Sequence, residues 1–387
     1  MEQLNSNVLI IGRSGVGKSS LLNYMFDRNI QETGVGSPVT KKGIFPSSYE
    51  YDDALKLKIY DTWGLEPDKT EEWKKLIVDE VHKHDKMEVR EWFNTIIYCI
   101  SANSDRVEDF EIEIMKALVR EKNQVTVAIT HCNNNKDVRA ENLKQRLVNT
   151  ADINAEQVVF VCNVDMNLIG GRVERFGKEK IFKIIISNLW ESFKTKVPYL
   201  IKKGVNSSFE DERKKLKNMI SEHWPIIERD KKIREFQEQF KDEFDKFIHR
   251  LIRDTNNNYL NIANYYEKLS NKYMNFGLLN EKILNNPEWK IEIQLFERFK
   301  RDVDDNVEIV REILGHFIFI LKTDLSKEVL KELFANALKY FSSTKNIKNQ
   351  LEKLVDENIE SSKTIIYKII DNINGQIQSS VINKTSK

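Results

Sequence analysis

Residues 12–19 read Gly12-Arg13-Ser14-Gly15-Val16-Gly17-Lys18-Ser19 and satisfy the phosphate-loop pattern G-x-x-x-x-G-K-[ST]. The apolar run Val8–Ile11 precedes this loop and predicts a buried strand, and residues 19–26 follow it with the pattern of a helix. A strand, a tight glycine turn and a helix N-terminus are the context in which such a loop binds phosphate. A plain glycine-rich turn before a helix is the alternative, and it leaves the lysine and serine unexplained. The stretch therefore predicts a nucleoside triphosphate site.

Each position of this loop has an expected role. Successive backbone N–H groups converge on phosphate oxygens, and the glycines keep side chains out of their way. Lys18 is expected to reach the outer phosphates, and the hydroxyl of Ser19 is expected to ligate Mg²⁺. We therefore expect nucleotide contacts from the whole loop and the residue after it, namely Gly12, Arg13, Ser14, Gly15, Val16, Gly17, Lys18, Ser19 and Ser20.

Strand and helix patterns alternate from the phosphate loop to about residue 193. Strands are expected near residues 42–45, 55–60, 95–100, 125–129 and 157–161, and helices near residues 71–85, 110–120 and 178–193. Continuous apolar strands that alternate with helices indicate a mostly parallel sheet covered on both faces. The predicted fold class is an α/β P-loop domain, and its candidate site residues follow the carboxyl ends of strands, where ligands bind in such sheets.

Two further segments are candidates for sensing the nucleotide. Thr40 lies in a glycine- and proline-containing loop and is our choice for a second Mg²⁺ ligand, although Thr33 competes for the role. Asp61 ends a strand and can hold Mg²⁺ through a water, while the N–H of Gly64 can contact the γ-phosphate. The expected catalytic set is Lys18, Thr40 and Gly64, and the expected metal ligands are Ser19, Thr40 and Asp61.

Leu65 stands directly after Gly64. An apolar side chain cannot orient a water molecule, so we expect slow intrinsic hydrolysis, or help from a partner subunit, Arg13 or backbone groups.

The order of Gly12–Ser19, Thr40, Asp61–Gly64, Thr130–Asn133 and Cys162-Asn163 resembles that of the translation-factor-related P-loop GTPases, over about the first 195 residues. The nearer resemblance is to the branch that contains the Era-like, septin-like and immunity-associated GTPases. This resemblance implies GTP and GDP as ligands, Mg²⁺ as cofactor and hydrolysis of GTP.

The base-reading motif of the family is [Asn/Thr]-Lys-x-Asp, and this chain departs from it. Thr130 fits, His131 replaces the lysine and Asn133 replaces the aspartate. A carboxylate accepts two hydrogen bonds from guanine, whereas an amide offers one acceptor and one donor. His131 could stack on the base and Asn163 could complete the pocket. We expect GTP rather than ATP, with loosened base specificity as the alternative.

Charge and cysteine content limit the remaining classes. Lys and Arg number 61 and Asp and Glu number 60, so the net charge of +1 argues against nucleic-acid binding by bulk charge. No apolar segment follows a basic N-terminus, and the 3 cysteines are dispersed. We expect a cytoplasmic protein.

Beyond residue 208 the pattern is helical throughout. The expected division is a GTP-binding domain over residues 1–198, whose last helix ends at Pro198, a linker over 199–207 that contains Gly204, and a helical bundle or stalk over 208–387. An apolar seam includes Phe244, Phe247 and Leu251, and residues 313–321 are apolar nearly all round, suited to a bundle core or a membrane-touching tip.

Three functions remain after this reading. The first is a GTPase whose switch loops signal nucleotide state, through the helical module, to a nucleotide-dependent homodimer or a protein effector. The second is a dynamin-like GTPase that acts on a membrane surface, which we do not favour. The third is a nucleotide-stabilised scaffold with little turnover.

Overall fold

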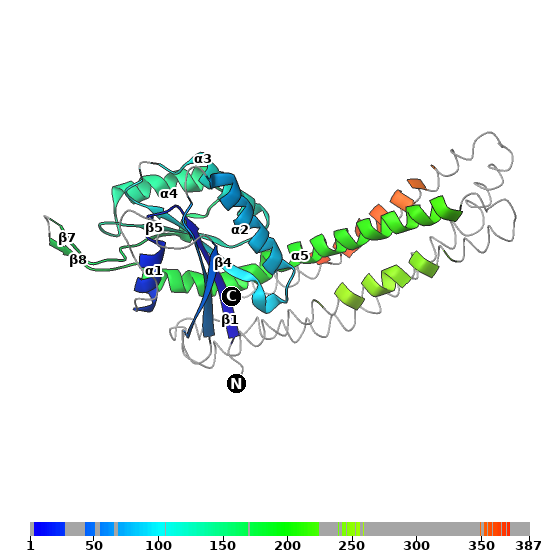
Figure 1. The fold of residues 1–387 in the computed structure, drawn as a ribbon, viewed down its shortest axis with the longest axis horizontal. Helices are drawn as coiled ribbons and strands as arrows, with labels where there is room; N and C mark the ends of the chain where they lie inside the picture. The colour runs from blue at the N-terminus through cyan, green and yellow to red at the C-terminus, as the bar shows by residue number, and fades with distance from the viewer. Residues whose placement is uncertain are drawn as a thin grey trace, which may run out of the picture. The chain divides into compact units, whose positions relative to one another are not determined.

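The computed structural model describes residues 4–27, 43–50, 55–65, 69–104, 106–168 and 171–223, with scattered residues between 239 and 258 and between 349 and 371. The chain divides into two compact units, Met1–Tyr199 and Leu200–Lys387 (Figure 1). The expected metal ligand Thr40, its competitor Thr33 and the apolar run 313–321 lie outside the described residues.

The first unit alternates strands and helices, as the apolar pattern predicts. Its strands are β1 (Leu4–Gly12), β2 (Ile44–Glu50), β3 (Leu55–Thr62), β4 (Phe93–Ser101), β5 (Val125–Thr130), β6 (Val158–Phe160), β7 (Met166–Leu168) and β8 (Gly171–Val173). Its helices are α1 (Lys18–Phe26), α2 (Thr70–Asp85), α3 (Asp109–Arg120), α4 (Val138–Thr150) and α5 (Lys178–His223), the last of which continues into the second unit.

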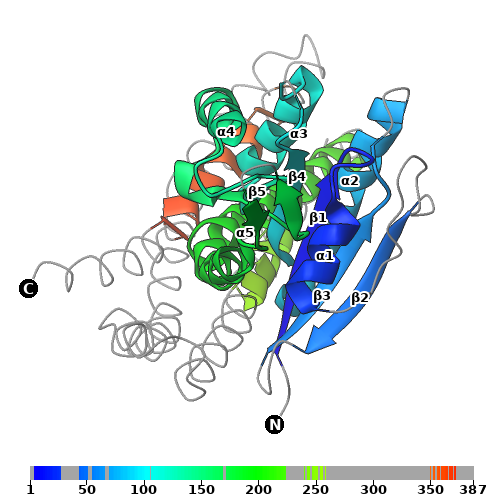
Figure 2. The same ribbon diagram turned by 90° about the vertical axis from the view of Figure 1, so that its left-hand side faces the viewer.

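Six strands form one sheet in the order β2-β3-β1-β4-β5-β6. All neighbours in it are parallel except β2, which pairs antiparallel with β3 at the edge (Figure 2). The expected mostly parallel sheet is confirmed. Because parallel strands end at the same edge, the loops after β1, β3, β4, β5 and β6 meet there.

Helices cover both faces of the sheet. Helices α2, α3 and α4 bury Trp73, Met115 and Leu143 in one continuous cluster with strand residues such as Leu9 and Tyr98. On the other face, Asn188 of α5 donates its Nδ2 to the hydroxyls of Thr95 and Thr126 at 3.1 and 3.2 Å. The strands therefore run as continuous apolar segments because both faces are covered.

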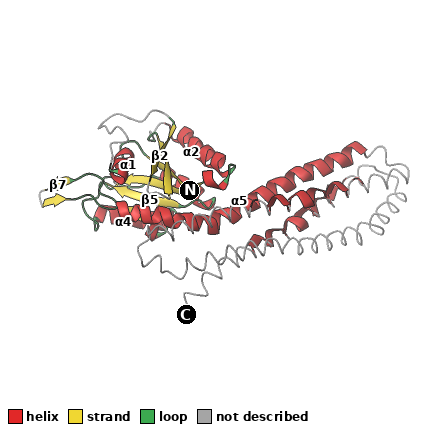
Figure 3. Ribbon diagram, turned by 90° about the horizontal axis from the view of Figure 1, so that it is seen from below, coloured by secondary structure: helices red, strands yellow, loops and turns green. Residues whose placement is uncertain are grey.

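The hairpin of β7 and β8 has no counterpart in the sequence prediction. It is a separate two-stranded antiparallel sheet between β6 and α5, and it stands away from the six-stranded sheet (Figure 3). Its strands are only three residues long, too short for the alternating pattern by which strands are recognised.

The expected linker over residues 199–207 is wrong as a conformation, because α5 runs through Pro198 and Gly204 to His223. Buried apolar residues recur at steps of four across the supposed break, at Val197, Ile201, Val205 and Phe209. This spacing keeps one stripe of the helix facing its neighbours. Burial of that stripe outweighs the local cost of the proline and glycine, which were the signals behind the linker prediction.

The second unit contains helical residues from three stretches of the chain. The Phe209 and Phe247 rings pack edge to face at 5.2 Å between centroids, and Lys217 pairs with Asp356 at 2.8 Å. Phe244, Phe247 and Leu251 of the expected seam are buried. These contacts join residues far apart in sequence within the described part of the second unit.

The structure bears on disulfide bonds and on membrane-spanning helices. Cys99, Cys132 and Cys162 are all buried, and none forms a disulfide. Among the residues that the structure describes, no helix has the length and apolarity to span a membrane.

Candidate nucleotide-binding site

The phosphate loop joins β1 to α1 at the carboxyl edge of the sheet. Gly15 and Gly17 have φ values of 77° and 89°, the left-handed region that glycine enters without strain. At Gly12 a Cβ would lie 2.5 Å from the carbonyl oxygen of Cys99, so only glycine fits against β4. The loop conformation therefore requires the glycines of the sequence pattern.

Lys18 is the first residue of α1 and is 6 % exposed. Its Nζ donates to the carbonyl oxygens of Gly12 and Arg13 at 3.1 and 2.9 Å, so the loop closes around the ammonium group. Burial lowers the pKa of Lys18, and the charge of Asp61 opposes that change. The result is a desolvated cation bonded to carbonyl groups of the phosphate loop.

Asp61 is the second-last residue of β3, lies at the same carboxyl edge of the sheet and is 1 % exposed. Neither of its carboxylate oxygens has a side-chain hydrogen-bond partner among the described residues. Burial raises the pKa of Asp61 to about 6, although the charge of Lys18 and the backbone N–H of Thr62 act against this. A buried carboxylate without such a partner costs free energy unless a cation completes it.

Gly64 and Leu65 lie directly against the phosphate loop. The N–H of Ser14 donates to the carbonyl of Leu65 at 3.1 Å, and the N–H of Leu65 donates to the carbonyl of Gly12 at 3.2 Å. A Cβ on Gly64 would lie 2.4 Å from the Cα of Ser14, so a side chain is excluded there. Leu65 itself is 2 % exposed, with its side chain in the core cluster that includes Trp63.

Loops after β5 and β6 hold the phosphate loop from the opposite side. The hydroxyl of Thr130 donates to the carbonyl of Val16 at 2.6 Å, and Nδ2 of Asn163 donates to the carbonyl of Gly17 at 3.2 Å. The structure thus brings the two predicted base-side residues Thr130 and Asn163 together with the predicted phosphate-side residues.

His131 also reaches this edge, in an unusual backbone conformation. Its φ is 56°, which is strained for a residue with a side chain. Its ring lies beside Gly17, where a Cβ would come within 3.1 Å of the ring atom Cε1. Burial lowers the pKa of His131, which favours the neutral imidazole.

The remaining loop residues differ in exposure. Ser14 and Gly15 are exposed, and Ser19 and Ser20 are half-buried at the start of α1. Arg13 is half-buried. Its charge acts on Glu111 of α3, where burial raises the pKa and the charge of Arg13 opposes the rise. The charge of Arg13 is therefore directed in part toward Glu111 of α3.

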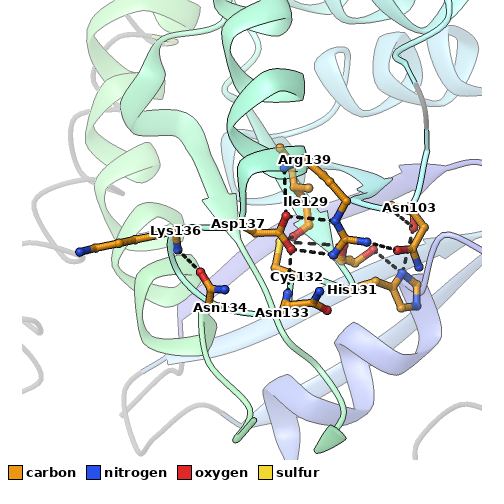
Figure 4. Close-up of polar contacts among 11 residues, drawn as sticks. Asn103, Ile129, His131, Cys132, Asn133, Asn134, Lys136, Asp137 and Arg139 are labelled. Carbon is orange, nitrogen blue, oxygen red and sulfur yellow. Dashed lines mark hydrogen bonds and ion pairs between the residues drawn. The ribbon is translucent and has the colours of Figure 1, made fainter. Parts of the chain in front are cut away.

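The loop after β5, which carries His131 and Asn133 and is called the base-side loop below, is supported by residues to which no sequence motif pointed. Asp137 caps α4 and accepts the backbone N–H of Asn133 at 2.9 Å, while Arg139 bonds to Asp137 and Asn103 (Figure 4). Hydrogen bonding from the Arg139 side chain is the main reason that the pKa of Asp137 is lowered to about 2. An aspartate before a helical pattern is an N-cap signal, so the role of Asp137 as a cap could have been predicted.

Residues 7–132 match the family model described as 50S ribosome-binding GTPase. The match contains the phosphate loop and the Asp61–Gly64 segment, whose geometry is that of a P-loop site. The N-terminal domain is a P-loop GTPase domain. The matched stretch of the GTPase domain ends at Cys132, directly before Asn133.

Solved structures similar to the GTPase domain include three from different proteins. Toc33 from Arabidopsis thaliana with GDP and Mg²⁺ has 16% identity and a TM-score of 0.36, over 48% of this chain and 84% of that one. The septin GTPase domain from Chlamydomonas reinhardtii has 15% identity and a TM-score of 0.34, over 49% and 93%. Era with MgGDPNP and a 16S ribosomal RNA fragment has 16% identity and a TM-score of 0.35, over 48% and 57%.

These TM-scores are too low to support an assignment. The description of the N-terminal domain as a P-loop GTPase domain therefore rests on the family match and on the geometry of the site. No curated protein sequence is significantly similar to the chain.

Proposed function

We propose that this chain binds GTP with Mg²⁺ and hydrolyses it to GDP and phosphate. The observation that supports this most is a pair of buried charges at the strand ends. The Lys18 ammonium is enclosed by the phosphate loop, and its charge acts on the Asp61 carboxylate, which lacks a side-chain hydrogen-bond partner. A bound triphosphate would neutralise the charge of the Lys18 ammonium, and a divalent cation would neutralise that of the Asp61 carboxylate.

The donor set suits magnesium. Mg²⁺ prefers oxygen ligands and keeps several waters, and Asp61 and the Ser19 hydroxyl supply oxygens at this edge. Thr40 remains a proposed third ligand from outside the described residues. When bound, the ion would neutralise charge on the outer phosphates.

Hydrolysis would proceed by in-line attack of water on the γ-phosphate. The chain's own part is to bind and orient the triphosphate through loop N–H groups, the Lys18 charge and the N–H of Gly64. The Leu65 side chain is buried in the core and is therefore not available to orient the attacking water. Slow turnover without a second copy of the chain or a protein effector follows from this.

GTP is proposed over ATP because Thr130, His131 and Asn163 lie together beside the phosphate loop, in the order expected of GTPases. Asn133, with an amide in place of a carboxylate, would hold guanine less firmly. The proposed signalling role is that Asp61 and Gly64 respond to the γ-phosphate and the helical unit reports the change to a partner.

One alternative has an observation in its favour. A nucleotide-stabilised scaffold with little turnover would also account for the burial of Leu65. The membrane-acting alternative depended on residues 313–321, which lie outside the described part of the chain.

Phosphate release from Mg²⁺–GTP by the full chain and by Lys18→Ala tests the proposal. We expect release by the wild type and almost none by the variant, together with tighter binding of GTP than of ATP or XTP. A wild type that binds GTP but releases no more phosphate than Lys18→Ala is the scaffold. Absence of triphosphate binding at millimolar concentration would overturn the proposal, and preference for ATP would overturn its base assignment.

A further inference from the structure

A chain of polar contacts runs behind the loop that carries His131 and Asn133 (Figure 4). It starts at Asp137, which is 5 % exposed and caps α4. One oxygen of Asp137 accepts the backbone N–H of Asn133 at 2.9 Å. The backbone position of Asn133 is therefore held by a residue four places further along the chain.

Arg139 extends this chain of contacts to another loop. Its Nε and Nη2 donate to the two oxygens of Asp137 at 3.1 and 2.7 Å. Its Nη1 donates to Oδ1 of Asn103 at 2.6 Å, in the segment that follows β4. A planar guanidinium that bonds both oxygens of one carboxylate is restricted in orientation, so Arg139 links the two segments at a defined angle.

From Asn103 the contacts return to His131. The N–H of Asn103 donates to the hydroxyl of Ser101 at 3.1 Å, and that hydroxyl lies 3.1 Å from Nδ1 of His131. The contacts thus connect the backbone of Asn133 to the ring of His131 through residues that belong to no nucleotide motif. A strained residue such as His131 keeps its conformation only where its surroundings determine it.

Asp137 is fully occupied within this set. Its carboxylate accepts from the backbone N–H of Asn133, from the backbone N–H of Arg139 and from the Arg139 side chain. It therefore has no hydrogen-bonding capacity left to read a base itself. Its contacts act on Asn133 directly and, through Arg139, Asn103 and Ser101, on His131.

We propose that Asp137, Arg139 and Asn103 are positioning residues that set base selectivity, by holding Asn133 and His131 against the purine of a bound nucleoside triphosphate. This inference rests on the proposed nucleotide site. In this proposal the three residues act through Asn133 and His131 and not by direct contact with the phosphates or the base.

The same helix offers a matched control. Arg146 of α4 is 41% exposed and pairs with Asp109 at 3.2 Å, whereas Arg139 is 43% exposed. The Arg146–Asp109 pair is exposed on both sides and contributes little to stability, whereas Arg139 pairs with the buried carboxylate of Asp137, so the melting temperature of each variant is measured beside its affinity. Only Arg139 is connected to the base-side loop, and Asn103 is an exposed residue whose truncation leaves the core untouched.

The experiment measures dissociation constants of Mg²⁺–GTP and Mg²⁺–ATP for the full chain and for Arg139→Ala, Asn103→Ala and Arg146→Ala, with the melting temperature of each. We expect the ATP-to-GTP ratio of dissociation constants to fall about tenfold in the first two variants, the worth of roughly one oriented hydrogen bond. Arg146→Ala should keep the wild-type ratio. Arg139→Lys should recover part of the loss, because it keeps the charge without the planar fork.

An unchanged ratio in folded Arg139→Ala and Asn103→Ala overturns the inference, and so does a lower melting temperature with the ratio unchanged. A wild type that binds GTP and ATP equally overturns it as well, while leaving the phosphate site intact. A wild type that binds no triphosphate fails the proposed function instead, which separates the two outcomes.

Discussion

The phosphate side and the base side of the site are built in different ways. On the proposed phosphate side, one loop of eight consecutive residues, Gly12–Ser19, forms the site, and four of its positions, Gly12, Gly15, Gly17 and Lys18, must be glycine or lysine for geometric or electrostatic reasons. On the proposed base side, side chains from the loops after β4 and β5 and from α4 contact one another, and Asn163 after β6 contacts the backbone of Gly17. A binding loop that uses its backbone accepts few residue types at each position. A site built from side chains that contact one another can change several of those residues together and keep the contacts.

The largest expected effect tests the phosphate side. Lys18→Ala should weaken GTP and ATP binding alike by about a hundredfold, because the hydrogen bonds of a charged donor are lost whatever the base. Lys58→Ala is the control, since Lys58 is a half-buried lysine of β3 that pairs with Glu91 at 3.2 Å. Equilibrium titration with both nucleotides measures this. Retained affinity, or a loss confined to GTP, would show that the two sides are not separable as described.

Glycine substitutions test the contact between the two sides. Gly15 and Gly17 both have left-handed φ, but a Cβ on Gly15 meets nothing within 4 Å, whereas one on Gly17 meets His131 and Asn163 at 3.1 and 3.2 Å. Gly17→Ala should therefore lower the unfolding free energy by about 1 kcal/mol more than Gly15→Ala, because the backbone strain is shared and only the crowding differs. Denaturant unfolding of the nucleotide-free protein provides the comparison. Equal losses of unfolding free energy in the two variants would mean that His131 and Asn163 move aside without cost.

A single substitution should bring the base side closer to the family pattern. Asn133→Asp supplies a carboxylate that can accept two hydrogen bonds from guanine, so GTP affinity should rise about tenfold while XTP affinity falls. Asn134→Asp, one residue away and exposed, makes the same change in charge and should alter neither. Competition between GTP and XTP for a fluorescent analogue reports the result. Equal gains in both variants would point to general electrostatics in place of base reading.

The smallest effect is a difference in pH dependence. Burial raises the pKa of Asp61 to about 6 from 3.8, so between pH 7 and 5 the folded state takes up a proton that the unfolded state does not, which stabilises it. Burial lowers the pKa of His131 from 6.5, so over the same range the unfolded state protonates first and folding is disfavoured.

The two sides should therefore titrate with opposite sign. In nucleotide-free, magnesium-free protein, Asp61→Asn should make the melting temperature fall more steeply from pH 7 to pH 5, and His131→Gln should make it fall less steeply, by a few degrees in each case. Thermal unfolding across that range provides the measurement. Slopes changed in the same direction by both variants would contradict the opposed environments of these two groups.

Local sequence predicted the sheet and the strand, turn and helix around the phosphate loop well. The run from Val8 to Ser19 defines its strand, its turn and its helix start through contiguous residues, and Asp61 and Gly64 follow a strand whose apolar pattern is plain. The linker prediction failed because proline and glycine were weighted above the four-residue apolar spacing that continues through Val197, Ile201 and Val205. Thr40 stays a prediction, because it lies outside the described residues.

By itself the sequence determined that this domain contains a phosphate loop between a strand and a helix, because the backbone geometry of that loop allows few residue types at adjacent positions. The tertiary structure alone decided that Leu65 is buried, that Asp61 lacks a side-chain partner among the described residues, and that Arg139 reaches Asn103, 36 residues away. Such contacts depend on which strand ends and helices become neighbours. Which elements become neighbours is decided by burial of the whole sheet, so no single stretch of the sequence predicts these contacts.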